Sequence, residues 1–309
     1  MRATRRLGLR NRDMGAQMTI RPRRSLLYMP GSNVRALEKA KTLPVDGVIL
    51  DLEDAVAPDA KASARDQVAA AVKAGGFGAR EVFIRVNGID TPWFADDIRA
   101  AIAAAPDAIL IPKVSTPEQP ERIGERLLSM HANLHTRIWA MIETPTAVFN
   151  VRAIAATAKD SETRLAGFVM GTNDLAKETR AHIVPGRAPM AAWLTSCVLA
   201  AREFGIDILD GVYNDIADTE GFAAECAQAR DFGFDGKTLI HPSQIEACNA
   251  AFSPTPDEVA QARKMIAAFD QPENKDKGVV QIEGRMVERM HAEMARRTVA
   301  IAEAIAARG

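Results

Sequence analysis

The stretch Arg137-Ile-Trp-Ala-Met-Ile-Glu-Thr-Pro145 decides how the rest of the chain is interpreted. Its apolar run, residues 138–142, has the length of a buried strand, and Pro145 marks where that strand has to end. Glu143 follows the run directly, and a carboxylate at the end of a buried strand loses solvation unless it has a partner. The stretch therefore predicts a buried strand that carries an acidic side chain into a polar site.

The same design recurs along the chain as apolar runs that alternate with helix-like segments. The pattern predicts strands at residues 25–29, 47–52, 82–86, 108–111, 138–142, 166–170, 207–211 and 237–240. Segments with helical spacing lie between them, such as 61–73, 95–105 and 190–204. This alternation predicts an α/β fold, a (β/α)8 TIM barrel. An open doubly wound sheet is the alternative, but no Gly-x-Gly-x-x-Gly follows the first strand.

The chain divides into three parts by composition. Residues 1–21 form a basic leader, which we expect to be disordered or to precede a true start at Met18; an organellar transit peptide is the alternative. Residues 22–252 form the barrel. Residues 253–309 form a C-terminal helical extension with helices at 257–269 and 288–307 and a short strand at 279–282. We expect this extension to pack on the barrel or on a neighbouring subunit.

The overall charge and the cysteines narrow the functional classes. The 309 residues include 39 basic and 40 acidic side chains, so the net charge of -1 gives no electrostatic footprint for nucleic acid. No apolar run approaches the roughly 20 residues that span a bilayer. The three cysteines are widely spaced and form no Cys-x-x-Cys pair, which is typical of buried thiols in a reducing compartment. We therefore expect a cytoplasmic protein.

Polar residues stand at the carboxyl ends of five of the predicted strands, and in a barrel such residues face the active site. They are the segments Asp51-Leu-Glu53-Asp54, Arg85-Val-Asn87, Pro112-Lys113, Glu143-Thr144 and Gly171-Thr-Asn-Asp174. Glu143 and Asp174 follow adjacent strands, and two carboxylates without His or Cys favour Mg²⁺. A carboxylate pair that shares a proton is the competing interpretation. Arg85 favours a metal because a guanidinium beside the site indicates an anionic, chelating substrate.

These segments, together with Arg24-Ser-Leu-Leu-Tyr-Met-Pro-Gly31, Gly233-Phe-Asp-Gly-Lys237 and Ile240-His-Pro-Ser-Gln-Ile245, resemble the HpcH/HpaI aldolase and citrate lyase β-subunit (CitE-like) family. The resemblance covers residues 22–305 in the same order. It implies a TIM barrel, assembled as a homotrimer or a dimer of trimers. It also implies Mg²⁺-dependent cleavage or formation of a carbon–carbon bond in a 3-hydroxyacyl-CoA of the citryl-, malyl- or citramalyl-CoA type, with an oxo acid as the other reactant.

By the same resemblance, Glu143 and Asp174 hold Mg²⁺ and contact the substrate, and Arg85 grips the substrate. Glu53 belongs to the polar network of the site. Lys39, Ile240 and His241 lie where the family places coenzyme A.

The chain departs from the family pattern in the segment Glu283-Gly-Arg-Met-Val-Glu288. The family usually ends this segment with an aspartate, the proposed base, which the tail of a neighbouring subunit supplies. Glu288 keeps the carboxylate and adds a methylene, a shift large enough to change a proton transfer. Asn173, where many relatives carry Glu, is a milder difference. The leading hypothesis is a carbon–carbon lyase; the alternatives are a malyl-CoA-type thioesterase, a CoA-independent pyruvate aldolase and an accessory lyase subunit.

Overall fold

The computed structural model describes residues 20–308. The leader expected at residues 1–21 lies almost wholly outside the described residues. The chain separates into two compact units, residues 22–255 and residues 256–307, and each is described by itself below.

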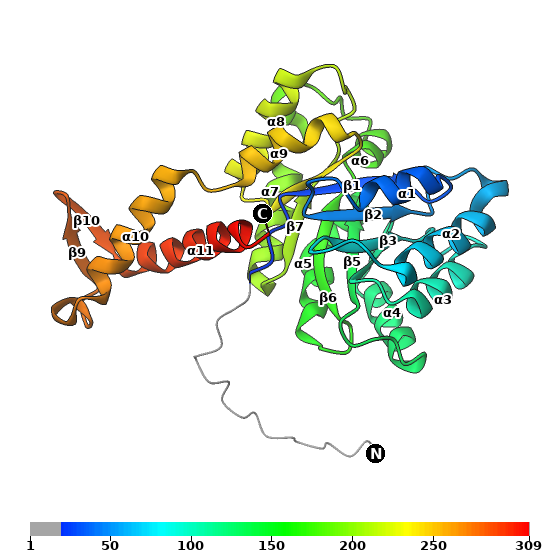
Figure 1. The fold of residues 1–309 in the computed structure, drawn as a ribbon, viewed down its shortest axis with the longest axis horizontal. Helices are drawn as coiled ribbons and strands as arrows, with labels where there is room; N and C mark the ends of the chain where they lie inside the picture. The colour runs from blue at the N-terminus through cyan, green and yellow to red at the C-terminus, as the bar shows by residue number, and fades with distance from the viewer. Residues whose placement is uncertain (1–19, 309) are drawn as a thin grey trace, which may run out of the picture. The chain divides into compact units, whose positions relative to one another are not determined.

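The first unit is a closed barrel of eight parallel strands (Figure 1). The strands are β1 (Ser25–Pro30), β2 (Gly47–Asp51), β3 (Glu81–Arg85), β4 (Ala108–Ile111), β5 (Arg137–Ile142), β6 (Leu165–Met170), β7 (Asp207–Asp210) and β8 (Gly236–Leu239). Each strand pairs with the next, and β8 pairs with β1, where Leu26 lies opposite Thr238. The barrel prediction is confirmed, and closure of the sheet excludes the open doubly wound alternative.

Helices connect the strands because parallel neighbours need a crossover, and the helices cover the outside of the sheet (Figure 1). The α-helices are α1 (Val34–Ala40), α2 (Lys61–Ala74), α3 (Phe94–Ala104), α4 (Glu118–Ser129), α5 (Pro145–Ala156), α6 (Thr172–Thr179), α7 (Ala191–Phe204), α8 (Thr219–Phe232) and α9 (Ile245–Phe252). Short 3-10 turns stand at η1 (Pro58–Ala60), η2 (Thr157–Lys159), η3 (Pro185–Met190) and η4 (Pro242–Gln244). The start of two helices follows from the residue type at the N-cap. The side chains of Thr144 and Asp218 cap α5 and α8 by accepting backbone N–H groups of the first turn.

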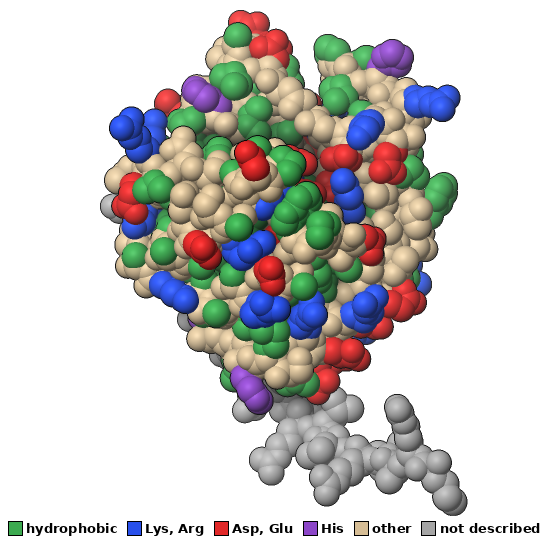
Figure 2. Space-filling view, turned by 90° about the vertical axis from the view of Figure 1, so that its right-hand side faces the viewer, with side chains coloured by type: hydrophobic (Ala, Val, Ile, Leu, Met, Phe, Trp, Pro, Cys, Tyr) green, Lys and Arg blue, Asp and Glu red, His purple; other side chains and the backbone are tan. Residues whose placement is uncertain are grey.

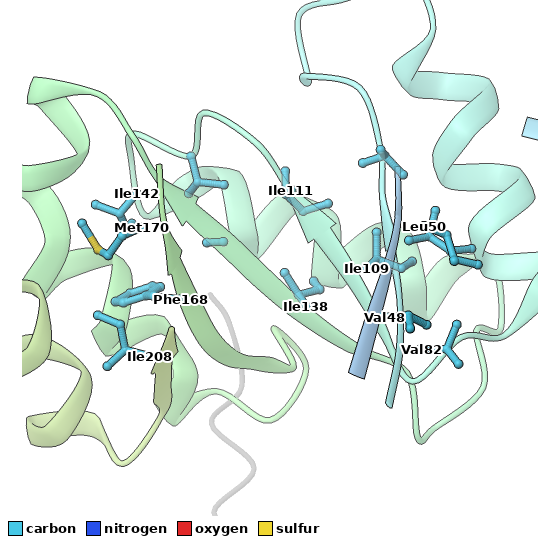
Figure 3. Close-up of a cluster of buried hydrophobic side chains, with 14 of the residues drawn as sticks. Val48, Leu50, Val82, Ile109, Ile111, Ile138, Ile142, Phe168, Met170 and Ile208 are labelled. Atoms are coloured by element: carbon cyan, nitrogen blue, oxygen red, sulfur yellow. The ribbon is translucent and has the colours of Figure 1, made fainter. Parts of the chain in front are cut away.

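Alternation along the strands produces two apolar layers. The outward side chains pack under the helices, and Figure 3 shows part of this layer, including Leu50, Ile109 and Phe168. The inward side chains fill the barrel, where the ring of Trp139 meets the ring of Phe83 edge-on, with 5.2 Å between centroids. Gly167 makes room for that indole, because a Cβ there would lie 2.5 Å from it. The interior is therefore a packed core below a polar end.

The structure bears on two expectations from composition, the state of the cysteines and the absence of a membrane-spanning segment, for the residues that it describes. Cys197, Cys226 and Cys248 are buried free thiols, as expected. Among the described helices, none is long and apolar enough to cross a membrane. Basic and acidic side chains are interspersed over the face drawn in Figure 2.

The second unit is a helical hairpin with a small two-stranded sheet at its turn. It consists of α10 (Pro256–Asp270), η5 (Pro272–Asn274), β9 (Val279–Ile282), β10 (Arg285–Glu288) and α11 (Arg289–Ala306). Phe269, Val280, Val287 and Ala292 form an apolar cluster of its own. The strand β10 was not predicted from the sequence. It forms because Glu283 and Gly284 adopt φ values of 50° and 81°, which make a tight turn that folds β10 back along β9.

Candidate active site

A cavity of about 340 Å³ lies at the carboxyl ends of the barrel strands. Asp51 and Arg85 reach it from the ends of β2 and β3, Glu143 from the residue after β5, and Asp174 from the first turn of α6. Tyr28 on β1 also lines it. The structure therefore brings Arg85, Glu143 and Asp174 together at one opening, although three different strand ends supply them.

Arg85 is held by Asp51 on the neighbouring strand. Its Nε and Nη2 atoms donate to the two carboxylate oxygens of Asp51 at 2.6 and 2.7 Å. Asp51 is fully buried and also accepts the backbone N–H groups of Glu53 and Ala55. These partners stabilise the anion, so the pKa of Asp51 is lowered despite the opposing effect of burial, which is the largest single influence on it. The forked edge of Arg85 is therefore committed to Asp51, and its Nη1 atom is the one directed toward Glu53 and Asp54, at 2.9 and 3.2 Å.

The loop after β2 is fixed from below by buried polar groups. Lys61 donates from Nζ to the carbonyls of Leu52 and Glu53 at 2.8 and 2.7 Å. Asn87, at the end of β3, donates to the same Leu52 carbonyl at 2.9 Å. These bonds hold the backbone of residues 51–55, and with it the Asp51 and Glu53 side chains, in one position.

Glu143 is almost fully buried and is anchored by one backbone bond. Its Oε1 atom accepts the N–H of Lys113 at 2.6 Å. Gly171 is the close neighbour on the other side, since a Cβ there would lie 2.4 Å from Oε2. The pKa of Glu143 is raised to about 7: burial is the main cause and the nearby charge of Asp174 adds to it, against smaller opposing effects of Lys113 and Arg85.

These two carboxylates fit a magnesium ion. Within residues 20–308, no group of three or more potential His, Cys, Asp or Glu ligands occurs, which excludes a site built entirely from such side chains there. Mg²⁺ commonly takes only one or two carboxylates and leaves its other positions to water and substrate. The negative charges of Glu143 and Asp174 repel each other, and a divalent cation bound between them would offset this repulsion.

Glu53 is the second carboxyl group with a raised pKa. Its pKa is raised to about 8, chiefly by burial; Arg85 opposes the rise, and the charges of Asp54, Glu143 and Asp51 add to it. Glu53 does not itself line the cavity; it lies beside it, with Oε2 2.9 Å from Nη1 of Arg85. Its predicted role in the site stays a prediction.

The residues predicted to bind coenzyme A are not gathered in this cavity. Ile240 lines it. Lys39 is exposed on α1 and does not line it. His241 is exposed as well, and its Nδ1 caps η4 by accepting the N–H of Ser243 at 3.2 Å. The coenzyme A assignment for Lys39 and His241 stays a prediction.

Glu288 belongs to the second unit, where it is the last residue of β10 and the N-cap of α11. The expected helix thus begins one residue later than the sequence pattern indicated. The Glu288 side chain accepts from the backbone of His291, and its own N–H donates to Nδ1 of His291 at 3.1 Å. Its role as a base stays a prediction.

Tyr28 was not singled out from the sequence, and Asp51 was named only as part of the polar segment at the end of the second strand, without a role. Side chains alternate between the two faces of a strand, so residues two apart share a face. Ile49 and Leu26 face the barrel core, and the alternation therefore indicates that Asp51 and Tyr28, two residues later on the same strands, also point into the barrel. Asn214, in the loop after β7, exchanges two hydrogen bonds with Asn173, at 2.8 and 3.1 Å. The sequence offers no local signal for that pair, because its members are 41 residues apart.

The fold and the cavity define a (β/α)8 barrel with an acidic, arginine-containing site at the carboxyl ends of its strands. The model of the HpcH/HpaI aldolase/citrate lyase family matches residues 24–242, and the chain belongs to this family.

Similar proteins match nearly the whole chain. A (3S)-malyl-CoA thioesterase of Cereibacter sphaeroides (strain KD131 / KCTC 12085) is 49% identical over 286 residues, which cover 93% of this chain and 96% of that protein. The citrate lyase subunit beta of Escherichia coli (strain K12) is 31% identical over 292 residues, covering 93% and 95%. The crystal structure of CitE from Mycobacterium tuberculosis in complex with magnesium, acetoacetate and coenzyme A is 28% identical, with a TM-score of 0.73 over 91% of this chain and 98% of that one.

Proposed function

We propose that this protein is a Mg²⁺-dependent enzyme that hydrolyses the coenzyme A thioester of a short 3-hydroxy dicarboxylic acid of the malyl-CoA type. The observation that carries the proposal is the convergence of Glu143, Asp174 and Arg85 on one cavity. The identity of 49% with (3S)-malyl-CoA thioesterases favours hydrolysis among the reactions open to such a site. The complex of the M. tuberculosis CitE with magnesium and coenzyme A supports both ligands.

In this proposal Glu143 and Asp174 hold the metal, which supplies a Lewis acid to the oxygens of the substrate. Arg85 supplies positive charge for the substrate carboxylate. Because its Nε and Nη2 atoms are engaged by Asp51, the Nη1 atom makes this contact, and the substrate carboxylate then competes there with Glu53 and the exposed Asp54. Glu53 takes a proton from the attacking water, since its pKa of about 8 lets it accept a proton and release it again near neutral pH.

We also propose where coenzyme A binds relative to this cavity. We place the thioester end of the substrate at Ile240, which lines the cavity wall beside β8. Lys39 and His241 are exposed residues of the loops and helices that follow β1 and β8, which are adjacent strands. They are therefore available to the nucleotide end of coenzyme A on that side of the barrel.

A carbon–carbon lyase is the second candidate, and the identity of 31% with a citrate lyase subunit beta favours it. Cleavage needs a base that removes the proton of the substrate hydroxyl group, and we assign this step to Glu288 of a neighbouring subunit. The products are then acetyl-CoA and an oxo acid, and no water is consumed.

One experiment separates the two reactions. Malyl-CoA is incubated with the purified protein and Mg²⁺, and the products are resolved by mass spectrometry. Hydrolysis gives free coenzyme A and malate in equal amounts, whereas cleavage gives acetyl-CoA and glyoxylate. A chelator of Mg²⁺ should abolish either reaction. If malyl-CoA, citramalyl-CoA and citryl-CoA are all recovered unchanged, the proposed function is wrong.

A further inference from the structure

Tyr28 is the aromatic side chain of the cavity, and the proposed mechanism leaves it without a role. It lies on β1, two residues after Leu26, which faces the barrel core. Its ring packs against Arg85, with the guanidinium carbon 4.8 Å from the ring centroid. It is half-buried, and the cavity is where it is open to solvent.

The other hydrogen-bond donors on the cavity wall are largely committed to the protein itself. The Arg85 nitrogens face Asp51, Glu53 and Asp54. Asn173 and Asn214 pair with each other. Thr238 donates from its hydroxyl to the carbonyl of Asp210 at 3.1 Å.

Two hydroxyl groups remain on this wall. The Thr172 hydroxyl packs against Gly211, where a Cβ would lie 2.5 Å from it, and Thr172 is only 6% exposed. The Tyr28 hydroxyl has no hydrogen-bond partner anywhere in residues 20–308. Tyr28 therefore offers a donor to whatever occupies the cavity.

The surroundings keep this phenol protonated. Burial raises its pKa well above the usual value; Arg85 opposes this, while the charges of Asp51, Glu143 and Glu53 add to the rise. A neutral phenol has a proton to donate, and this one lies against the Arg85 guanidinium.

We propose that the Tyr28 hydroxyl donates a hydrogen bond to the thioester carbonyl oxygen of the substrate as negative charge develops on that oxygen. This inference rests on the proposed function only in taking a coenzyme A thioester as the substrate. In hydrolysis, water adds to the carbonyl carbon and the C=O electron pair moves onto the oxygen. In carbon–carbon cleavage, the electron pair of the broken bond forms an enolate, and the charge is again on that oxygen. The role of Tyr28 is therefore the same in both reactions, and it requires no proton transfer.

The first test is the variant Tyr28→Phe, which removes the hydroxyl and keeps the ring against Arg85. Loss of a donor to a developing oxyanion typically lowers turnover by about 10²- to 10³-fold, so we expect kcat to fall in that range with KM nearly unchanged. Tyr213→Phe is the matched control. Tyr213 is the other tyrosine of the chain, and its hydroxyl donates to Asp218 at 2.5 Å in the loop after β7. This control should keep full turnover.

Three results would overturn the inference. They are a Tyr28→Phe variant with kcat within about threefold of the wild type, a loss confined to KM, and an equal loss of kcat in Thr172→Val. A purely structural role for Tyr28 would instead lower the thermal midpoint and the amount of active enzyme while leaving the kcat of the folded fraction unchanged.

A second measurement does not depend on turnover. Acetyl-CoA and Mg²⁺ are added, and the ultraviolet difference spectrum of tyrosine is recorded for the wild type, Tyr213→Phe and Tyr28→Phe. We expect a tyrosine signal in the first two and none in the third. If this pattern appears but no hydroxyacyl-CoA is consumed, the proposed function fails, while the contact of the Tyr28 hydroxyl with a bound thioester stands and its part in catalysis falls. If the wild type gives no tyrosine signal on binding, the inference on Tyr28 fails.

Discussion

At the scale of single residues, Glu143 and Glu53 hold protons at pH values where exposed glutamates have lost them. Their pKa values rise to about 7 and about 8, from an ordinary value of 4.5, chiefly because both are buried. The folded protein therefore binds more protons than the unfolded chain between about pH 5 and 8, and its free energy of unfolding falls as the pH rises through this window. Asp51, whose pKa is lowered, contributes stability that is lost only under acidic conditions and is constant in this window.

We expect the thermal midpoint of the metal-free protein to fall between pH 5 and pH 8, and Glu143→Gln to make that fall smaller. Mg²⁺ should do the same for the wild type, because the cation takes the place of the Glu143 proton. The measurement is thermal unfolding across this pH range, with and without Mg²⁺. If Glu143→Gln shows the same pH dependence as the wild type, the buried carboxyl group of Glu143 is not the origin of the effect.

A second prediction at this scale concerns Arg85. Lysine has one ammonium group and cannot meet both oxygens of Asp51, which is fully buried. Removing one partner of a buried pair typically costs about 3–5 kcal/mol, so we expect Arg85→Lys to lower the free energy of unfolding by up to that amount and to abolish turnover. Urea unfolding measures the first effect. Arg152→Lys is the control, since its pair with Glu203 is exposed and should change little; equal losses in both variants would contradict the argument.

The sequence was sufficient to predict Arg85, Glu143 and Asp174 as residues that converge, because each follows a strand and parallel strands end on the same side. It was not sufficient to predict what Arg85 contacts. The pairing with Asp51 depends on β2 and β3 being in register, with Asp51 opposite Arg85. The reciprocal contact of Asn173 and Asn214 likewise depends on how two loops meet. Such contacts are three-dimensional and leave no trace in residue spacing.

At the scale of elements, all eight barrel strands lie within one residue of the ranges predicted at their starts and ends. Short, mostly apolar runs between turns were enough, because strands such as β2 and β4 are buried along their whole length. The strand β10 was missed for the opposite reason. Three of its four residues are exposed, so no apolar run marks it, and only the turn at Glu283 and Gly284 produces it.

The junction between β6 and α6 carries an element-scale prediction. At Gly171 a Cβ would lie 2.3 Å from the Glu143 Cβ and 2.4 Å from its Oε2, so Gly171→Ala has to move the carboxylate or the loop. We expect this variant to remain folded and to need at least about tenfold more Mg²⁺ for half-maximal activity, since a misplaced ligand weakens a metal site. Titration calorimetry with Mg²⁺ measures this. Gly88→Ala is the control, because its Cβ would meet its nearest neighbour at 3.6 Å; the same Mg²⁺ affinity in both variants would mean that Gly171 does not position Glu143.

At the scale of the whole molecule, the two units have separate apolar cores. The barrel cluster includes no residue beyond Phe252, and the cluster of the second unit begins at Phe269. We propose that the chain assembles as a homotrimer or a dimer of trimers, and that the second unit carries Glu288 to the cavity of a neighbouring subunit.

This arrangement predicts complementation between inactive variants. Glu143→Gln damages the cavity and Glu288→Gln damages the tail, so each should be nearly inactive in carbon–carbon cleavage when it is alone. If a site joins the barrel of one subunit to the tail of the next, random mixed trimers from equal amounts of the two variants regain about a quarter of the sites. The measurement is malyl-CoA cleavage after the variants are expressed together.

Glu143→Gln with Asp174→Asn is the control, and it should regain nothing because both changes lie in the same cavity. If mixed oligomers form without recovering activity, each tail serves its own barrel. If Glu288→Gln is fully active alone, the base lies elsewhere, and Glu53, which contacts Arg85 beside the cavity and has a pKa of about 8, is the next candidate.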